Sequence, residues 1–166
     1  LGNKFLSHIR EVKIIAHVVR AFEDPDVIKE GAVDPKSDYQ TINMELMFAD
    51  LSTLEKVAEN RKAEPVKKTA ALKAIAGINE GKPVRSQSFT DEEKEALHDL
   101  FLISAKPEIV VLNVDEESLS KAEEIMQNYA GMLEVPRDKF VVVCAKIESE
   151  LAALDEEEQK EYLKDL

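Results

Sequence analysis

The stretch IVVLNVDEES, residues 109–118, decides the fold predicted for this chain. Its first residues form an uninterrupted apolar run, which is typical of a strand in a parallel sheet. The run ends at Asn113, and a carboxylate follows three residues later at Glu116. Parallel sheets of α/β proteins hold their ligands at the carboxyl ends of the strands. The stretch therefore predicts both a parallel sheet and a candidate site at its edge.

Two other apolar runs complete the predicted sheet, at residues 14–19 and 140–144. The β-branched run 14–19 suits a strand that is buried on both faces. A helix through about Ala130 separates the second strand, 108–112, from the third, and another helix begins near Glu148. This order of strand, helix, strand and helix predicts a parallel sheet covered by helices, with right-handed crossovers. Capping boxes begin two more helices, one formed by Thr90 and Glu93 and the other by Asp155 and Glu158.

Apolar residues at helical spacing predict a long helix over residues 38–57, and Pro65 separates it from a second helix over 66–78. Together these helices form a predicted hairpin, with the apolar stripe of the first helix as its own seam. The stripe consists of Ile42, Leu46, Met47, Phe48, Leu51, Leu54 and Val57. We predict that residues 36–85 form this hairpin, and that residues 1–35 and 86–166 form the sheet-containing domain.

Composition limits the possible classes of protein. The chain has 166 residues, about one domain's worth, and 44% of them are hydrophobic. No apolar run approaches the roughly 20 residues that a membrane span needs, and a single cysteine, Cys144, excludes an internal disulfide framework. These features predict a globular cytoplasmic protein without a membrane partner.

The net charge of −12 argues against a surface that binds nucleic acid everywhere. Residues 56–85 differ from the rest, because eight basic and three acidic residues give them a local charge of +5. An anionic partner could dock there, although a solvated helical surface without a partner explains the same pattern. The candidate partner-binding residues are Arg61, Lys62, Lys67, Lys68 and Lys73.

The candidate site combines Asn113 with the stretch CAKIESE, residues 144–150, which follows the third predicted strand. An Asn side chain offers a hydrogen-bond donor and an acceptor, whereas a carboxylate accepts from two donors side by side. At adjacent strand ends, these groups can hold the edge of a purine. An Asn after a strand is also a common turn or helix-start residue, so a purely structural role stays open.

Several stretches resemble, in order, the Obg-like ATPase family, also called YchF proteins. The resemblance runs from residue 1 to residue 166 and implies part of the nucleotide-binding (G) domain of the P-loop GTPase class. It also implies that the helical hairpin is a coiled-coil arm inserted in that domain. The stretches that carry it are LGNKFLSHIREVKIIAHVVRAFEDPD, GAVDP, INMELMFADLSTLEK, EGKPVRS, AKPEIVVLNVDE and VVVCAKIESELAAL.

The resemblance assigns residues 113–116 to base recognition, where ordinary relatives have Asn-Lys-x-Asp. It implies base contacts from Asn113, the Val114 backbone and Glu116, and a second base-side loop at Cys144, Ala145 and Lys146. The family is taken to prefer ATP over GTP. Its longer Glu relaxes the rejection of adenine, which presents an acceptor where guanine presents a donor. The Lys146 side chain is expected to lie along the ring.

No Gly-x-x-x-x-Gly-Lys-Ser/Thr motif occurs in these 166 residues, and we identify no Mg²⁺ ligand and no catalytic residue. The resemblance therefore covers the middle of the family's sequence, between the P-loop half and a β-rich TGS domain. It implies an ATP-hydrolysing, Mg²⁺-dependent, ribosome-associated switch, and we expect this chain alone to be inactive. The alternative is a non-catalytic module that binds RNA or a protein through its basic helical arm.

Overall fold

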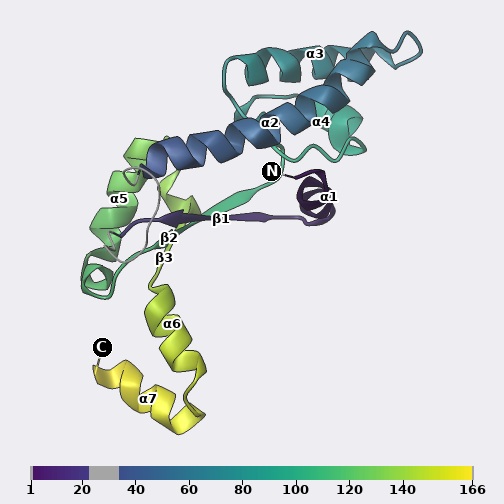
Figure 1. The fold of residues 1–166 in the computed structure, drawn as a ribbon. Coiled ribbons are helices and arrows are strands. Elements are labelled where there is room, and N and C mark those ends of the chain that lie inside the picture. Colours follow the sequence, from purple (N-terminus) through teal and green to yellow (C-terminus); the bar gives the residue numbers. More distant parts are fainter. Residues whose placement is uncertain (1, 23–33, 166) are drawn as a thin grey trace. The chain divides into compact units, whose positions relative to one another are not determined.

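The computed structural model describes residues 2–22 and 34–165 (Figure 1). The chain divides into two compact units, one formed by Leu1–Ile15 and Tyr39–Glu108 and the other by Ala16–Asp38 and Ile109–Leu166. Among the described residues, no helix combines the length and the apolar character needed to cross a membrane. The predicted division at residues 35 and 85 stays a prediction.

The second unit is built on a sheet of three strands, β1 (Ile15–Arg20), β2 (Glu108–Asn113) and β3 (Phe140–Val143), in the order β1-β2-β3. β2 and β3 are parallel, with Asn113 opposite Val143. The N–H groups at the two ends of β1, those of Ile15 and Ala21, donate to the carbonyl oxygens of Pro107 and Asn113 at 3.0 and 2.8 Å. Because both bonds span the same sequence offset, β1 also runs parallel to β2. The parallel sheet predicted from the apolar runs is confirmed.

The two faces of this sheet differ in burial. Val19, Val110 and Phe140 point to a buried face. Val18 is 65% exposed, and Ile109 and Val141 on the same face of the sheet are also exposed. The expectation that the first strand is buried on both faces is therefore wrong for this chain. A β-branched run indicates a strand, but it does not show whether the described residues cover both of its faces.

Helices follow the strands in the predicted order. A 3-10 turn, η2 (Glu117–Lys121), leads into α5 (Ala122–Leu133), which packs against β3, and η3 (Arg137–Lys139) precedes that strand. α6 (Ala145–Ala152) begins directly after β3, earlier than the predicted start near Glu148. α7 (Glu156–Asp165) begins with the predicted capping box, since the Glu158 N–H donates to Asp155 Oδ1 and the Asp155 N–H donates to Glu158 Oε2.

The first unit is mainly helical. It contains α1 (Asn3–Glu11), most of α2 (Pro35–Glu59), α3 (Pro65–Asn79), η1 (Val84–Ser86) and α4 (Asp91–His98). Pro65 is the first residue of α3, a position where the missing N–H breaks no helical hydrogen bond. Leu54 of α2 and Ala70 and Ala74 of α3 belong to one buried cluster, so the two helices pack together. That this pair is a coiled-coil arm inserted in a G domain stays a prediction.

The apolar stripe of α2 is only partly buried. Leu46, Met47 and Leu54 are buried as predicted, whereas Phe48 is 65% exposed, so its place in the seam is wrong. Successive helical residues are turned by about 100°, which carries Phe48 off the buried face that includes Met47. The capping box of α4 is confirmed, because the Glu93 N–H donates to Thr90 Oγ1 and the Thr90 N–H donates to Glu93 Oε2.

Two buried carboxylates fix α2 within the first unit. Asp50 has no exposed surface and accepts hydrogen bonds from the N–H groups of Ile103 and Ser104 at 2.8 and 2.7 Å. The guanidinium of Arg10 lies 3.7 Å from the same carboxylate. Burial raises the pKa of Asp50 above its ordinary value, against the opposing effect of these hydrogen bonds. Asp50 thus joins α2 to the segment that follows α4.

The second buried carboxylate is Glu108. It accepts a 2.6 Å hydrogen bond from the Tyr39 hydroxyl and forms a 2.7 Å ion pair with Arg85. Arg85 also donates to Asn43 Oδ1 at 2.7 Å. Burial, together with the hydrogen bond to Glu108, raises the pKa of Tyr39 to about 12. This network closes the first unit where β2 begins.

Candidate functional site

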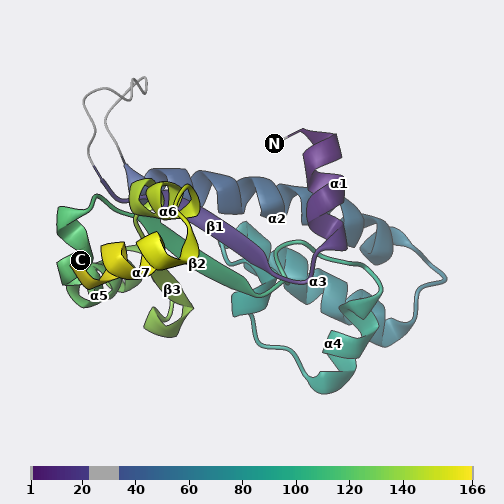
Figure 2. The same cartoon turned by 90° about the horizontal axis from the view of Figure 1, so that it is seen from below.

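The ends of β2 and β3 lie side by side and bring the two predicted halves of the site together. Asn113 is the last residue of β2 and is opposite Val143, the last residue of β3. Asn113 Oδ1 accepts a 2.9 Å hydrogen bond from the backbone N–H of Ala145, the first residue of α6. Figure 1 shows the chain running from β3 into α6, and in Figure 2 α6 is drawn over one end of the sheet. The stretches 113–116 and 144–146 are therefore neighbours in space.

These contacts determine which atoms can meet a ligand. Because Asn113 Oδ1 and the Ala145 N–H bind each other, the Asn113 Nδ2 amide is the side-chain donor that remains for a ligand. The Val114 N–H donates to the Val143 carbonyl at 2.9 Å, and the Val114 side chain is buried. The backbone contact predicted for Val114 is thus restricted to its carbonyl oxygen.

Cys144 is the N-cap residue of α6, and its side chain makes no capping hydrogen bond. The thiol is buried, so the backbone is the part of Cys144 that can contribute to a site. The N–H groups in the first turn of a helix have no intrahelical partner and carry a partial positive charge. In α6 these groups include that of Lys146, next to the Ala145 N–H that Asn113 binds.

The two carboxylates after Asn113 behave differently. Asp115 Oδ1 accepts a 2.8 Å hydrogen bond from the Ser118 N–H, and hydrogen bonding to Ser118 lowers the pKa of Asp115. Asp115 therefore stabilises the local turn. Glu116 is directed to the other strand end, where its Oε2 lies 4.0 Å from Lys146 Nζ. Both side chains are exposed, so this ion pair adds about 1 kcal/mol or less to stability and leaves the carboxylate accessible.

Tyr162 of α7 is a neighbour of the site that the sequence did not indicate. Its hydroxyl donates a 2.7 Å hydrogen bond to Glu150 of α6. This hydrogen bond raises the pKa of Tyr162, and the negative charges of Glu150 and Glu116 act in the same direction. No local pattern marks Tyr162, because its place depends on how α7 folds back toward α6.

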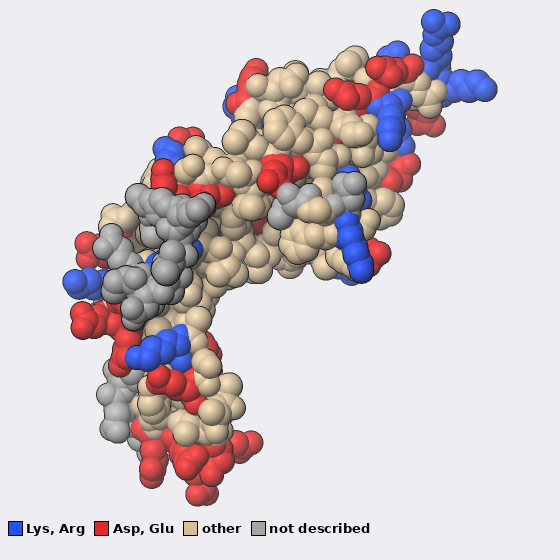
Figure 3. All heavy atoms as spheres, in the orientation of Figure 1, with Lys and Arg blue, Asp and Glu red and all other residues tan. Residues whose placement is uncertain are grey.

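The predicted partner-binding lysines of the helical hairpin are partly engaged. Lys67 Nζ donates to both carboxylate oxygens of Asp99 at 2.6 Å, and Lys73 Nζ donates to Glu93 at 2.9 Å. Figure 3 shows Lys and Arg side chains projecting at the end of the hairpin, with Asp and Glu side chains beside them. These ion pairs reduce the positive charge that is available to a phosphate.

The donors and acceptors at the strand ends suit a purine. Asn113 Nδ2 can donate to the ring nitrogen N7, which adenine and guanine share, while Glu116 can accept from an amino group. In residues 2–22 and 34–165, no group of three or more His, Cys, Asp or Glu side chains could hold a metal ion. The described residues thus fit the base of a nucleotide.

The chain is similar to known proteins over its whole length. No protein-family model matches the sequence. The ribosome-binding ATPase YchF of Bacillus subtilis is 40% identical over 178 residues, which cover all of this chain and 48% of that protein. This chain is a homologue of the YchF and Obg-like ATPases. Obg-like ATPase 1 of Saccharomyces cerevisiae is 32% identical over 190 residues, again covering the whole chain and 46% of the relative.

A solved structure supports the same relationship. The structure of the Schizosaccharomyces pombe YchF GTPase aligns with a TM-score of 0.73 at 30% sequence identity, covering 99% of this chain and 48% of that protein. The α/β fold with a parallel sheet is thus shared with a YchF protein. The chain spans about half the length of the curated relatives that it matches.

Proposed function

We propose that this chain supplies the base-binding side of the nucleotide site in a YchF-type ATPase that associates with ribosomes. The observation that carries the proposal is the hydrogen bond between Asn113 and the first residue of α6, which joins the two strand ends expected to hold the base. The names of the relatives, ribosome-binding ATPase and Obg-like ATPase, support the nucleotide and the partner. A ribosome-associated protein works in the cytoplasm, so we extend the proposal to that location.

Within this proposal, each residue has one task. The Asn113 Nδ2 amide donates to the purine N7, and Glu116 accepts from the amino group of the base, which in adenine is N6 on the same edge as N7. The aliphatic part of Lys146 lies along the ring, and its ammonium group stays near Glu116, 4.0 Å away in the structure. The phosphates of ATP are normally held by a Gly-rich P-loop. These 166 residues contain no such sequence, so this chain contributes contacts to the base only.

We also propose that the base contacts favour ATP over GTP. Guanine offers two neighbouring donors to a short Asp carboxylate, whereas this chain has Val114-Asp115-Glu116 after Asn113, and Asp115 is occupied by the Ser118 N–H. The longer Glu116 side chain is not fixed against both guanine donors, so it does not penalise adenine strongly. Discrimination then depends on Glu116 rather than on Asn113.

Substitution of Asn113 tests the proposal in the natural protein that carries this chain. Asn113→Ala removes the Nδ2 donor and frees the Ala145 N–H, and we expect ATP affinity to fall about tenfold or more, measured by calorimetric titration. Asn128→Ala, an exposed Asn on α5, is the matched control and should leave affinity unchanged. Equal ATP affinity of the Asn113→Ala and wild-type proteins would contradict the proposal.

Ribosome association requires a separate measurement, since nucleotide binding and partner binding are independent claims. We expect the natural protein to sediment with purified ribosomes, and Asn113→Ala to alter the dependence of this sedimentation on ATP. If the natural protein binds ATP but does not sediment with ribosomes, the proposed ribosome association is wrong and only the proposed nucleotide binding stands.

A further inference from the structure

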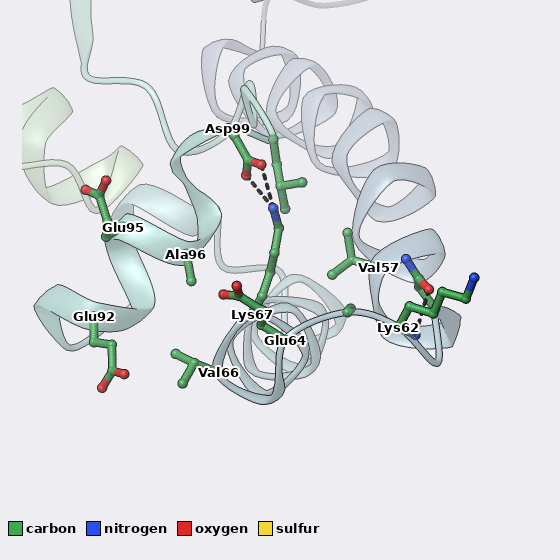
Figure 4. A pocket seen from close by; sticks show the side chains of 12 residues that line it. Val57, Lys62, Glu64, Val66, Lys67, Glu92, Glu95, Ala96 and Asp99 are labelled. Atoms are coloured by element: carbon green, nitrogen blue, oxygen red, sulfur yellow. Dashed lines mark hydrogen bonds and ion pairs between the residues drawn. The ribbon is translucent and has the colours of Figure 1, made fainter.

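An open pocket of about 730 Å³ lies at the end of the helical hairpin (Figure 4). The end of α2, the turn over residues 60–64, the start of α3 and the face of α4 all contribute to it. Its apolar lining comes from the half-buried side chains of Val57, Val66 and Leu100, with Ala63 and Ala96 between them. Such a surface can bury an apolar side chain of a partner.

Carboxylates line the side of this pocket that α4 forms. Glu92, Glu95 and Asp99 lie three to four residues apart, a spacing that places them on one face of α4 and its C-cap. Lys67 neutralises Asp99 through the hydrogen bonds at 2.6 Å (Figure 4). Among the described residues, none forms an ion pair with Glu64, Glu92 or Glu95. Lys62 also lines the pocket and forms no ion pair with a described residue, so three unpaired carboxylates face one unpaired ammonium and the free charge is mainly negative.

The charges around the pocket determine which partner fits it. Phosphate groups would be repelled by Glu64, Glu92 and Glu95, whereas Lys or Arg side chains would be attracted. Lys67, the cation closest to the middle of the pocket, already forms its ion pair with Asp99. The surface thus favours a basic protein segment over RNA, although it lies on the hairpin whose sequence carries the local positive charge.

We propose that this pocket binds a short basic segment of another protein. One apolar side chain of the segment packs against Val57, Val66 and Leu100, and flanking Lys or Arg side chains pair with Glu92 and Glu95. From Glu92 to Asp99 the helix rises about 10 Å, which corresponds to about three residues of extended chain. The segment is therefore short, and its recognition rests on alternating basic and apolar side chains.

A defined peptide tests the proposal on the full chain. The probe is a fluorescent peptide of alternating Lys and Leu, titrated with the protein by fluorescence anisotropy, next to a peptide in which Ser replaces Leu. We expect saturable binding of the Lys-Leu peptide and weaker binding of the Lys-Ser peptide. Absence of saturable binding up to millimolar protein, or equal binding of both peptides, would overturn the proposal.

Charge-neutral variants localise the binding. We expect the double variant Glu92→Gln, Glu95→Gln to bind the Lys-Leu peptide with about fivefold lower affinity, because two exposed ion pairs are lost. Glu55→Gln combined with Glu59→Gln makes the same change in charge on exposed residues of α2 outside the pocket, and should alter affinity less than twofold. Equal losses in the two double variants would show unspecific attraction and reject the site.

RNA is the competing partner, and a single-stranded oligonucleotide tests it directly. We expect that the oligonucleotide does not displace the peptide and that its own weak binding is unchanged in the Glu92→Gln, Glu95→Gln variant. An oligonucleotide that displaces the peptide and loses affinity when Lys62 and Lys67 are replaced by Gln would overturn the proposal in favour of RNA.

Discussion

Asn113 and Ala145 lie 32 residues apart in the sequence and are joined by a 2.9 Å hydrogen bond from the Ala145 N–H to Asn113 Oδ1. The bond ties the end of β2 to the start of α6. Asn113 Oδ1 therefore joins the two strand ends, and Nδ2 is the donor that we propose binds the base. These two roles can be separated by substitution.

Asn113→Asp separates them, because Asp keeps an oxygen for the Ala145 N–H and loses the Nδ2 donor. Because the hydrogen bond to Ala145 is kept, we expect the free energy of unfolding to change by less than about 0.5 kcal/mol. ATP affinity should fall about tenfold or more, because the Nδ2 donor is lost. Asn113→Ala should lower both quantities. Urea denaturation and calorimetric ATP titration of the two variants measure this. ATP binding by the Asp variant at wild-type strength would show that Nδ2 has no part in it.

Shortening Glu116 tests how the base is selected. Glu116→Asp moves the carboxylate back by one methylene, toward the position that suits the two donors of guanine, so the ratio of GTP to ATP affinity should rise about tenfold. Competition titrations with the two nucleotides measure the ratio. Glu117→Asp makes the same change in the neighbouring exposed residue and should leave the ratio as it is. An unchanged ratio in Glu116→Asp would place selection elsewhere.

Removal of the Asp50 carboxylate should destabilise the first unit. Asp50→Ala leaves the buried N–H groups of Ile103 and Ser104 without their acceptor and Arg10 without its neighbouring carboxylate. We expect the free energy of unfolding to fall by about 3 kcal/mol or more, because removing one partner of a buried charged interaction leaves the other groups unpaired. Denaturation with urea measures the loss. A variant within 1 kcal/mol of wild type, on the scale of ordinary point substitutions, would mean that water replaces the carboxylate.

The buried Tyr39 predicts a change of stability at high pH. Its pKa is raised to about 12 in the folded chain, against an ordinary value of about 10 in the unfolded chain. The folded state keeps the proton that the unfolded state loses, so the free energy of unfolding should fall as pH rises from about 10 to about 12. Below this window Tyr39 contributes no slope.

Tyr39→Phe is the matching variant, since Phe keeps the ring and has no ionisable hydroxyl. Above about pH 10, where tyrosine in the unfolded chain loses its proton, we expect the free energy of unfolding to fall more steeply for the wild-type protein than for the variant. Urea denaturation over this range measures both slopes. Equal slopes would show that Tyr39 titrates normally in the folded protein.

Local patterns predicted much of the fold. The capping boxes at Thr90 and Asp155 and the three strands depend on neighbouring residues, and they were located to within one or two residues. The predicted start of α6 is too late, because the first turn of α6 is fixed by Asn113 across the sheet rather than by a local cap. Sequence patterns therefore succeed where the signal itself, a capping box or an apolar run, lies within a few residues.

The features that were missed depend on contacts between distant residues. The sequence presents Lys67 as a free cation, because its partner Asp99 lies 32 residues away. Tyr162 has no neighbours in the sequence that indicate its bond to Glu150. Val18 looked like a core residue, yet the described residues leave its face of the sheet open. Which charged side chains are paired and which apolar side chains are buried depends on the folded chain, so composition alone does not determine either.

NMR of the ¹⁵N-labelled chain tests most directly whether Asn113 and the start of α6 hold a purine base. ATP at millimolar concentration should shift the side-chain amide of Asn113 and the backbone amides of Ala145 and Lys146, whereas inorganic tripolyphosphate, which has no base, should not. The backbone amide of Ala74, in the other unit, is the internal control. Shifts with ATP alone are the predicted result; no shift at these three groups, or equal shifts with tripolyphosphate, would contradict the account.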